Sequence, residues 1–327
     1  LTREASLIEF RDVSYTYQPS KRAHLLARKS NPDTPADWGN SPSAYWALHN
    51  VSFALRQGEF FGIEGHTGSG KSTLLQHMNG LLHPSRGRVL VAGADIANKA
   101  ALAQAREQVG IVFQYPERQL FAETVFEDVA FGPRNMGLSN DEIEHRYLEA
   151  MRLVQLNGEA LHTASPFELS GGQQRRVAFA GVLAMNPRIL ILDEPAAGLD
   201  QHAREDFLQL IQQIHRSEGT TIVMVSHAMD DLARFCDRIL ILNQGEVFAL
   251  GAPAEVFADA QRCKSIGLGV PAAQAFANKL TDSGVVLSKQ DDLFTLDTLA
   301  DALTQACLTP TIASQPNTSF QTESANE

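Results

Sequence analysis

The chain has 327 residues, 44% of them hydrophobic and 20% charged, and its 38 acidic and 27 basic side chains give a formal charge of −11. This composition is typical of a globular protein with one large domain or two and enough apolar material for a core. An acidic chain repels phosphate backbones, so we expect no nucleic acid among its partners. Three widely spaced cysteines, Cys236, Cys263 and Cys307, argue against a disulfide scaffold or a zinc site and favour a reducing cytoplasm. The longest apolar runs reach about half of the ~18–20 residues that a membrane helix needs, and no signal-peptide pattern is visible, so we expect neither an integral-membrane nor a secreted protein.

Two segments near the N-terminus, 7–17 and 47–55, alternate apolar and polar residues and predict strands with one buried face. Residues 19–45 between them carry four prolines and four basic residues with little apolar periodicity. We expect this insertion to be a solvated, partly disordered loop. A basic contact surface for a membrane headgroup or a partner is the alternative.

From residue 60 onward the chain alternates strand-like and helix-like segments, which predicts an α/β sheet with helices on its faces. The predicted strands are 60–64, 109–114, 189–193, 221–225 and 238–242. The predicted helices are 72–79, 141–156, 172–185 and 200–217. A Gln-Gly turn at 244–245 predicts a hairpin to a strand at 246–250. Helical patterns return at 272–280 and 296–307, and the polar residues 309–327 predict a disordered tail.

A glycine-rich segment follows the predicted strand 60–64 and precedes the predicted helix 72–79. It fits the phosphate-binding pattern GxxxxGK[ST], in which glycines let backbone N–H groups converge on a phosphate at a helix N-terminus. Lys71 would reach the β- and γ-phosphates, and the Ser72 hydroxyl would ligate Mg²⁺. A glycine-rich turn without a ligand is the alternative. We therefore expect a nucleotide to bind at Gly65, His66, Thr67, Gly68, Ser69, Gly70, Lys71, Ser72 and Thr73.

The apolar strand 189–193 ends in two adjacent carboxylates, Asp193 and Glu194. Burying unpaired charge is costly, so a core strand seldom ends in this way by accident. Asp193 would hold the shell of a Mg²⁺ ion, and Glu194 would accept a proton from an attacking water. A strand end with two solvated acids is the alternative.

The segment 169–173 reads Leu-Ser-Gly-Gly-Gln and precedes a predicted helix, with Ser170 as its N-cap. Its two glycines would expose backbone N–H groups at a helix N-terminus, which makes a second anion site in the same chain. Two phosphate sites for one nucleotide make sense if another subunit supplies one of them. The residues of this second site are Ser170, Gly171, Gly172 and Gln173.

In this order the motifs resemble those of the nucleotide-binding subunits of ABC transporters. The resemblance implies that Gln114 contacts Mg²⁺ and a membrane subunit, that 197–200 form the D-loop, and that His227 contacts the γ-phosphate. It also implies that Tyr17 stacks on adenine. The implied fold is the ABC ATPase cassette, a P-loop NTPase with a mixed α/β sheet, an antiparallel edge and a helical subdomain. A merely structural histidine at the end of a strand is the alternative for His227.

The segments 65–77, 113–121, 131–135, 165–176 and 193–200 resemble more narrowly the energy-coupling factor importers, and within them the second of two ATPase subunits. This resemblance implies an ATPase that is peripheral at the cytoplasmic face of the membrane and powers uptake of vitamins or other micronutrients. The implied partners are a second, paralogous ATPase subunit, a transmembrane scaffold and a vitamin-binding membrane subunit. The segment 114–121 would dock the membrane subunit, although a simple turn with core side chains is the alternative.

The resemblance divides the chain into a nucleotide-binding cassette at 1–260, with a helical subdomain at about 115–185, and a helical region at 261–307 that pairs ATPase subunits. A regulatory appendage or helices packed on the cassette are alternatives for 261–307, and 308–327 would be a tail. Two other functions stay open, the ATPase of a related cobalt, nickel or other ABC importer and an ABC ATPase that transports nothing. Residues 73–169 leave no room for the long coiled coils of repair ATPases, and the single cassette argues against a translation factor.

Overall fold

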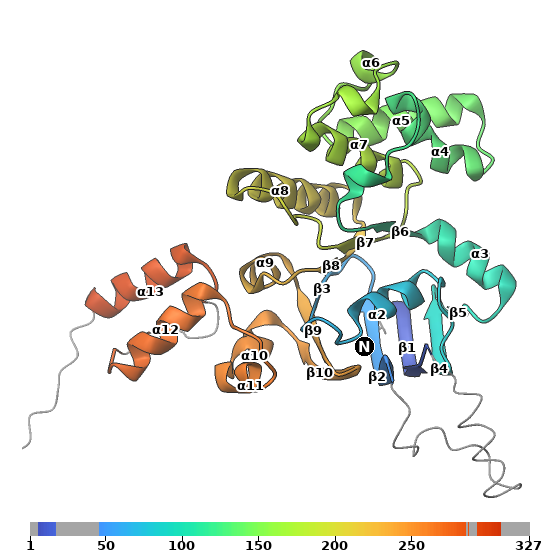
Figure 1. Cartoon of the computed structure of the whole chain (residues 1–327). Helices are drawn as coiled ribbons and strands as arrows, with labels where there is room; N and C mark the ends of the chain where they lie inside the picture. Colours follow the sequence, from blue (N-terminus) through green and yellow to red (C-terminus); the bar gives the residue numbers. More distant parts are fainter. Residues whose placement is uncertain (1–5, 18–45, 286, 288–292, 309–327) are drawn as a thin grey trace, which may run out of the picture. The chain divides into compact units, whose positions relative to one another are not determined.

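A computed structural model describes residues 6–17, 46–285, 287 and 293–308. The chain divides into two compact units, one ending at Val270 and one beginning at Pro271 (Figure 1). The predicted insertion at 19–45 and the predicted tail beyond residue 308 lie outside the described residues. Within the part that is described, no helix combines the length and apolarity needed to cross a bilayer.

The first sheet is antiparallel, with strand order β2-β1-β4-β5. It contains β1 (Ser6–Tyr15), β2 (Leu48–Arg56), β4 (Arg86–Val91) and β5 (Ala94–Asp95). The alternating pattern of the first two strands is confirmed. β4 was not predicted, because its outer half, with Arg86, Gly87 and Arg88, carries no apolar alternation. Gly87 has φ +78°, and a Cβ there would lie 2.3 Å from the carbonyl oxygen of Asp12, so the bulge between β1 and β4 requires glycine.

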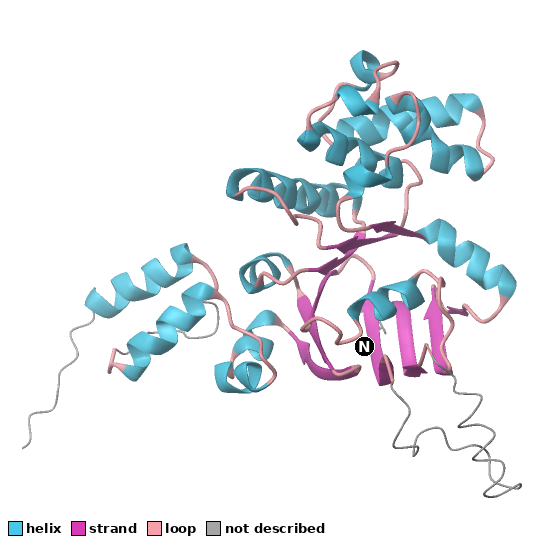
Figure 2. Cartoon of the chain, in the orientation of Figure 1, coloured by secondary structure: helices cyan, strands magenta, loops and turns pink. Residues whose placement is uncertain are grey.

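The second sheet has the order β10-β9-β3-β8-β7-β6 and is parallel except for its β10 edge (Figure 2). It contains β3 (Phe60–Glu64), β6 (Val109–Val112), β7 (Ile189–Asp193), β8 (Thr221–Val225), β9 (Arg238–Asn243) and β10 (Glu246–Gly251). Every residue of β3 and β8 is buried, which explains their continuous apolar sequences. The predicted α/β sheet with a terminal hairpin is confirmed.

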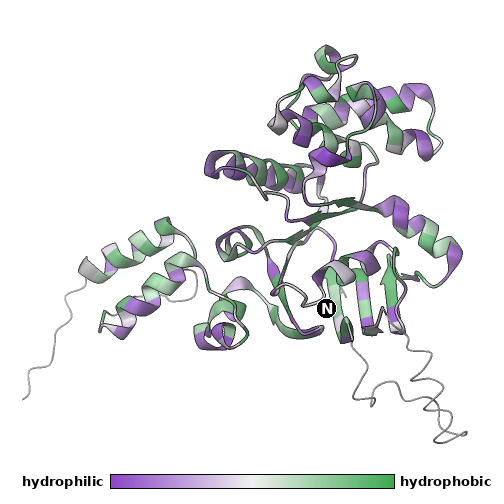
Figure 3. Ribbon diagram, in the orientation of Figure 1, coloured by the Kyte–Doolittle hydropathy of each residue, from purple (hydrophilic) through white to green (hydrophobic). Residues whose placement is uncertain are grey.

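Helices flank this sheet, and their apolar sides carry the core contacts (Figure 3). They are α2 (Lys71–Met78), α3 (Lys99–Gln108), α8 (Gln201–Glu218), α9 (Met229–Phe235), α10 (Pro253–Phe257) and α11 (Ala260–Ser265). In α8 the buried side chains recur at helical spacing from Phe207 to Ile214. Asp200 caps its first turn, and Gly219 ends it at φ +65°. α3 and α9 were not predicted, because they bury few side chains.

The segment between β6 and β7 forms a separate group of helices (Figure 2). It contains η2 (Pro116–Gln119), α4 (Val125–Asn135), α5 (Asn140–Leu153), α6 (Gly158–Leu161), η3 (Pro166–Glu168) and α7 (Gly171–Leu183). α4 and α5 pack on each other and on α7. The fully buried Phe179 of α7 lies with its ring 5.5 Å from that of Phe207 in α8, which fixes this group to the cassette.

The second unit contains α12 (Ala272–Asp282) and α13 (Leu296–Leu308). Its small core contains Ala273, Ala277, Leu287, Leu293, Leu299 and Ala302. The unit boundary lies ten residues later than the predicted 260/261, because α11 packs on the cassette. The buried Cys263 donates its Sγ–H to the carbonyl of Val256 at 3.5 Å, and Arg262 donates to the carbonyl of Phe248 at 3.1 Å.

Replacing Phe179 by alanine removes the aromatic contact that joins the helical group to the cassette. We expect Phe179→Ala to lower the free energy of unfolding by about 3–5 kcal/mol, because a buried ring leaves a cavity. Urea unfolding followed by circular dichroism measures this change. Phe167→Ala, at a ring that is mostly exposed, is the control and should change stability by less than about 0.5 kcal/mol. Equal losses in the two variants would contradict this account of the core.

Candidate functional site

Four neighbouring parallel strands, β3, β8, β7 and β6, end at the same edge of the second sheet. Loops at the carboxyl ends of such strands form the crevice in which α/β proteins bind ligands. The residues after these strands surround one cavity of about 500 Å³. It is lined by Tyr17, Ala47, Thr67, Gly68, Gly70, Lys71, Ser72, Thr73, Gln114, Asp193, Glu194, Val225 and His227. Residues predicted separately from five segments of the sequence therefore meet at one place.

The loop 65–70 links β3 to α2 and needs its glycines for steric reasons. A Cβ on Gly65 would lie 2.4 Å from the carbonyl oxygen of Leu242, and one on Gly70 would lie 2.5 Å from that of Ala47. Gly70 has φ +106° and stands at the N-cap of α2. Lys71, Ser72 and Thr73, the first residues of α2, line the cavity, so the N-terminus of this helix favours a bound phosphate there.

The β9–β10 hairpin is hydrogen-bonded to this loop. The backbone N–H of Gly245 donates to the carbonyl of Ser69 at 3.0 Å. The ring Nε2 of His66 lies 3.1 Å from Oδ1 of Asn243. The sequence predicted a turn at 244–245, but no local pattern indicated that this turn holds the phosphate loop. His66 and Ser69 therefore shape the loop and do not line the cavity.

The ammonium group of Lys71 lies inside the loop. It donates to the carbonyl of Gly65 and, at 3.3 Å, to that of His66. Partial burial lowers the pKa of Lys71, while the charges of Glu64, Glu194 and Asp193 act in the opposite direction. The hydrogen bonds hold the Lys71 ammonium at the loop, and the nearby acidic groups favour its charged form. A charged ammonium at this place can neutralise phosphate charge.

Asp193 and Glu194 stand at the end of β7 beside the last residue of β8. Asp193 pairs with Val225 in the sheet, and the N–H of Glu194 donates to the Val225 carbonyl at 3.1 Å. Glu194 has φ +51°, a costly conformation for a side-chain-bearing residue that is typical of functional sites. Burial raises the pKa of both carboxyl groups, and the charges of His227 and Lys71 oppose this. Oε1 of Glu194 is buried, has no hydrogen-bond partner in the part of the chain that the structure describes and lies 3.5 Å from Nε2 of His227, so it can accept a further hydrogen bond.

His227 follows β8 and lies between two acidic residues. Its Nδ1 is 3.1 Å from Oε1 of Glu64, the last residue of β3. Burial raises the pKa of the Glu64 carboxyl, while the hydrogen bond to His227 lowers it. Glu64 was not among the residues predicted from the sequence. The signal was present, because a carboxylate ends a buried apolar strand here as it does at Asp193.

Tyr17 and Gln114 lie two residues beyond the ends of their strands, β1 and β6, and both line the cavity. The Tyr17 hydroxyl lies 3.1 Å from Oγ1 of Thr73, and 58% of the side chain is exposed. The ring is therefore positioned at the start of α2 with most of its surface available for stacking.

Ser170, Gly171, Gly172 and Gln173 lie outside the cavity. They begin α7, where Ser170 and Gln173 form reciprocal cap hydrogen bonds. A Cβ on either glycine would have no atom within 4 Å, and both glycines are exposed. This second predicted anion site therefore faces away from the cavity of its own chain.

A buried guanidinium joins three parts of the site. Arg175 of α7 donates to both carboxylate oxygens of Glu117, at 3.0 and 3.1 Å, and to the carbonyl of Ala197 at 3.0 Å. Burial by itself raises the pKa of Glu117, but the hydrogen bonds and charge of Arg175 outweigh it and hold the pKa below its ordinary value. The helix that begins at Ser170, the segment after β6 and the segment after β7 are thus held together by one side chain.

The donor set of the cavity suits a nucleotide with a hard divalent cation. The hydroxyl of Ser72, the amide of Gln114 and the carboxylate of Asp193 all line it and offer oxygen ligands. Among the described residues no group of three or more His, Cys, Asp or Glu could hold a metal by itself. Few protein ligands are the rule for Mg²⁺, which shares its shell with water and substrate phosphates.

The family model of the ABC transporter matches residues 48–197. The energy-coupling factor transporter ATP-binding protein EcfA2 of Symbiobacterium thermophilum is 50% identical over 297 residues, which cover 90% of this chain and 95% of the relative. The protein of the same name from Caldanaerobacter subterraneus subsp. tengcongensis is 52% identical over 246 residues, 75% of this chain and 86% of the relative. This chain belongs to the EcfA2 family. It is an ATP-binding subunit of an energy-coupling factor transporter, and its cassette is that of the ATP-hydrolysing ABC ATPases.

Solved structures agree with this fold. CbiO1 from Clostridium perfringens, described as part of the ABC transporter complex cbiONQ, matches with a TM-score of 0.66 and 33% identity over 85% of this chain and 100% of that chain. The cassette MJ0796, described as a dimer in a post-hydrolysis state with ADP and Pi, matches with a TM-score of 0.59 and 31% identity over 75% of this chain and 98% of that chain.

Removing the Arg175 side chain leaves the Glu117 carboxylate uncompensated. We expect Arg175→Met to cost about 3–5 kcal/mol of unfolding free energy at neutral pH, because one partner of a buried pair is lost. Arg175→Lys should lose part of this unfolding free energy, because a lysine ammonium cannot reproduce the two parallel hydrogen bonds that the guanidinium makes to a carboxylate. Arg134→Met, at an exposed position on α4, is the control in urea unfolding.

The same pair gives a pH dependence with a defined sign. Because the folded pKa of Glu117 is lowered, its stabilisation is full above the ordinary value and declines as the pH falls through the folded pKa. The difference in unfolding free energy between wild type and Glu117→Gln should therefore shrink as the pH falls from neutral toward the acid range. A difference that grows on acidification would contradict the pairing.

Proposed function

We propose that this chain hydrolyses ATP at the cavity beside loop 65–73 to power an importer of vitamins or other micronutrients. The observation that carries the proposal is the meeting of Lys71, Ser72, Gln114, Glu194 and His227 around one cavity. The loop N–H groups and Lys71 bind the β- and γ-phosphates, and the exposed ring of Tyr17 stacks on the adenine. Ser72, Gln114 and Asp193 hold Mg²⁺, which neutralises phosphate charge.

Hydrolysis is an in-line attack of water on the γ-phosphorus of ATP. Glu194 accepts a proton from that water while the new P–O bond forms and the bond to the β-phosphate oxygen breaks, so that ADP leaves. Its unpartnered, buried Oε1 suits this role. Lys71 and His227 offset the negative charge that develops on the γ-phosphate oxygens.

The exposed N-terminus of α7 serves a second ATPase subunit. Ser170 to Gln173 of this chain cap the γ-phosphate at the partner's loop, and the partner's equivalent segment caps ATP bound here. ATP then contacts both subunits in the closed pair alone, so its differential affinity favours closure, and hydrolysis opens the pair. This arrangement accounts for Gly171 and Gly172, at which an added Cβ would meet no atom of the described residues within 4 Å. The partner is a paralogous ATPase, and the C-terminal unit with α12 and α13 helps to pair the two.

Glu194→Gln tests the proposed base. We expect the affinity for ATP to stay within about twofold and kcat to fall by about 10²–10⁴-fold, because the amide cannot take the proton. The assembled transporter is assayed for ATP binding and phosphate release, with Glu218→Gln at an exposed position as the control. Unchanged turnover in Glu194→Gln would rule out the proposed mechanism.

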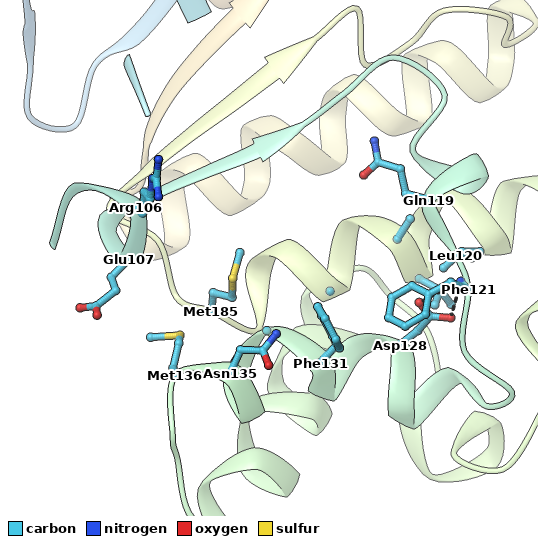
Figure 4. A pocket seen from close by; sticks show the side chains of 14 residues that line it. Arg106, Glu107, Gln119, Leu120, Phe121, Asp128, Phe131, Asn135, Met136 and Met185 are labelled. Carbon is cyan, nitrogen blue, oxygen red and sulfur yellow. Dashed lines mark hydrogen bonds between the residues drawn. The ribbon is translucent and has the colours of Figure 1, made fainter. Parts of the chain in front are cut away.

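A groove between α4, α7 and the segment after β6 is the proposed docking site of the membrane scaffold (Figure 4). It measures about 430 Å³ and has an apolar centre with Phe121, Phe131, Met136 and Met185. The rings of Phe121 and Phe131 meet edge to face at 5.0 Å. Charged groups, including Arg106 and Glu107, lie at one end of it. An apolar groove of this kind fits the apolar face of an amphipathic helix.

Only the last three residues of the predicted docking segment 114–121 line this groove, so we place the docking contact there. Gln119, Leu120 and Phe121 line it, whereas Glu117 is engaged by Arg175. Because Arg175 also holds the D-loop carbonyl of Ala197, a displacement of the segment by a membrane subunit reaches the ATP site through this side chain. The groove thus supports attachment of the ATPase to the cytoplasmic face of the membrane through other subunits.

Phe121→Ser tests this docking site. We expect it to weaken co-purification with the membrane subunits about 30-fold, as loss of an aromatic anchor worth about 2 kcal/mol does, and to leave the affinity for ATP unchanged. Leu81→Ser is the control, because Leu81 is similarly exposed, at 51% against 60%, but lies outside the groove. Normal recovery of the membrane subunits with Phe121→Ser would place the docking site elsewhere.

A further inference from the structure

Glu64 is a buried carboxylate for which the proposed ATPase mechanism has no role. It ends β3 directly before the phosphate loop, and its side chain is 1% exposed. Its Oε1 contacts Nδ1 of His227, and its Oε2 is buried without a hydrogen-bond partner among the described residues. A buried carboxylate in this position reduces the stability of the fold, whereas an apolar residue at the end of a buried strand does not. A group that reduces stability at a reaction centre calls for a functional reason.

The two ring nitrogens of His227 contact different acidic residues, and these contacts indicate a role for Glu64. Nδ1 lies 3.1 Å from Glu64, and Nε2 lies on the other side of the ring, 3.5 Å from Oε1 of Glu194. Glu64 is held in a central strand, where it pairs with Ile241 of β9, while the preceding Ile63 accepts the N–H of Ser226 at 3.4 Å. Glu194 by contrast lies in a loop, and the His227 side chain is 53% exposed. The rigid contact that orients the ring is therefore the one to Glu64.

We propose that Glu64 is a positioning residue for ATP hydrolysis, which holds Nδ1 of His227 so that Nε2–H points at the γ-phosphate. The contact with Glu64 occupies Nδ1 and leaves Nε2 as the ring nitrogen that can meet a phosphate oxygen or Glu194. Nε2–H can then donate to a phosphate oxygen or to Glu194. Carboxylates also fix the orientation of a histidine ring through its other nitrogen in metal sites and catalytic triads, although there the first nitrogen acts as a ligand or base and not as a donor.

The inference rests on the proposed role of His227 and predicts opposite effects on activity and stability. In the assembled transporter we expect Glu64→Leu to lower kcat about 10- to 100-fold, as loss of an orienting carboxylate does, with the KM for ATP within about threefold. The melting temperature should stay the same or rise, because a buried charge is removed and the exposed His227 is left solvated. Glu64→Gln keeps an oxygen next to Nδ1 and should recover part of kcat.

Glu59→Leu is the matched control, because Glu59 stands just before the same strand and its side chain is 4% exposed. It pairs with Arg238 at 2.9 Å, so its loss should lower the melting temperature and leave the kcat of folded protein unchanged. A wild-type kcat in Glu64→Leu, or a loss of kcat that accompanies a lower melting temperature and is not recovered by Glu64→Gln, would overturn the positioning role. If Glu194→Gln abolishes turnover while Glu64→Leu does not affect it, this inference alone fails. If Glu194→Gln leaves turnover intact, the proposed function fails as well.

Discussion

The site depends on one geometric constraint, the alignment of the carboxyl ends of β3, β8, β7 and β6 in a parallel sheet. Each strand delivers a different group to the same edge. The loop with Lys71 follows β3, His227 follows β8, Asp193 ends β7 with Glu194 directly after it, and Gln114 follows β6. Because parallel strands need crossovers between them, these groups are far apart in sequence and adjacent in space. The backbone pairing of the sheet thus sets the distances between the reacting groups.

Several wholly or partly buried carboxyl groups lie at this same edge of the sheet. Burial raises the pKa of Glu64, Asp193 and Glu194, and it lowers that of Lys71. Keeping these groups together costs folding free energy, which the apolar strands on which they stand offset. The positive φ of Glu194 adds local strain at the same place. The site therefore contains buried charges and a backbone conformation that are unfavourable by themselves and that the rest of the fold stabilises.

Much of the fold could be predicted because its strands bury continuous apolar runs and its main helices have clear apolar faces. β3, β7 and β8 lie where the sequence predicted them. β4, α3 and α9 were missed, because each presents few buried residues and so gives a weak periodic signal. Packing on the cassette was one of the alternatives that the sequence left open for residues 261–307, because a contact such as that of Cys263 with Val256 cannot be read from a local pattern.

The sequence by itself determined the chemistry: the phosphate loop, the paired acids after β7, the cap-forming Ser170 segment and the family to which they point. These are local patterns, in which spacing along the chain dictates the backbone shape. Only the tertiary structure decided which of these residues share a cavity, and that Ser170–Gln173 do not. It also decided that Arg175 holds Glu117 and that Glu64 holds His227, 163 residues away. Contacts of this kind follow from strand order, and no pattern within one segment encodes strand order.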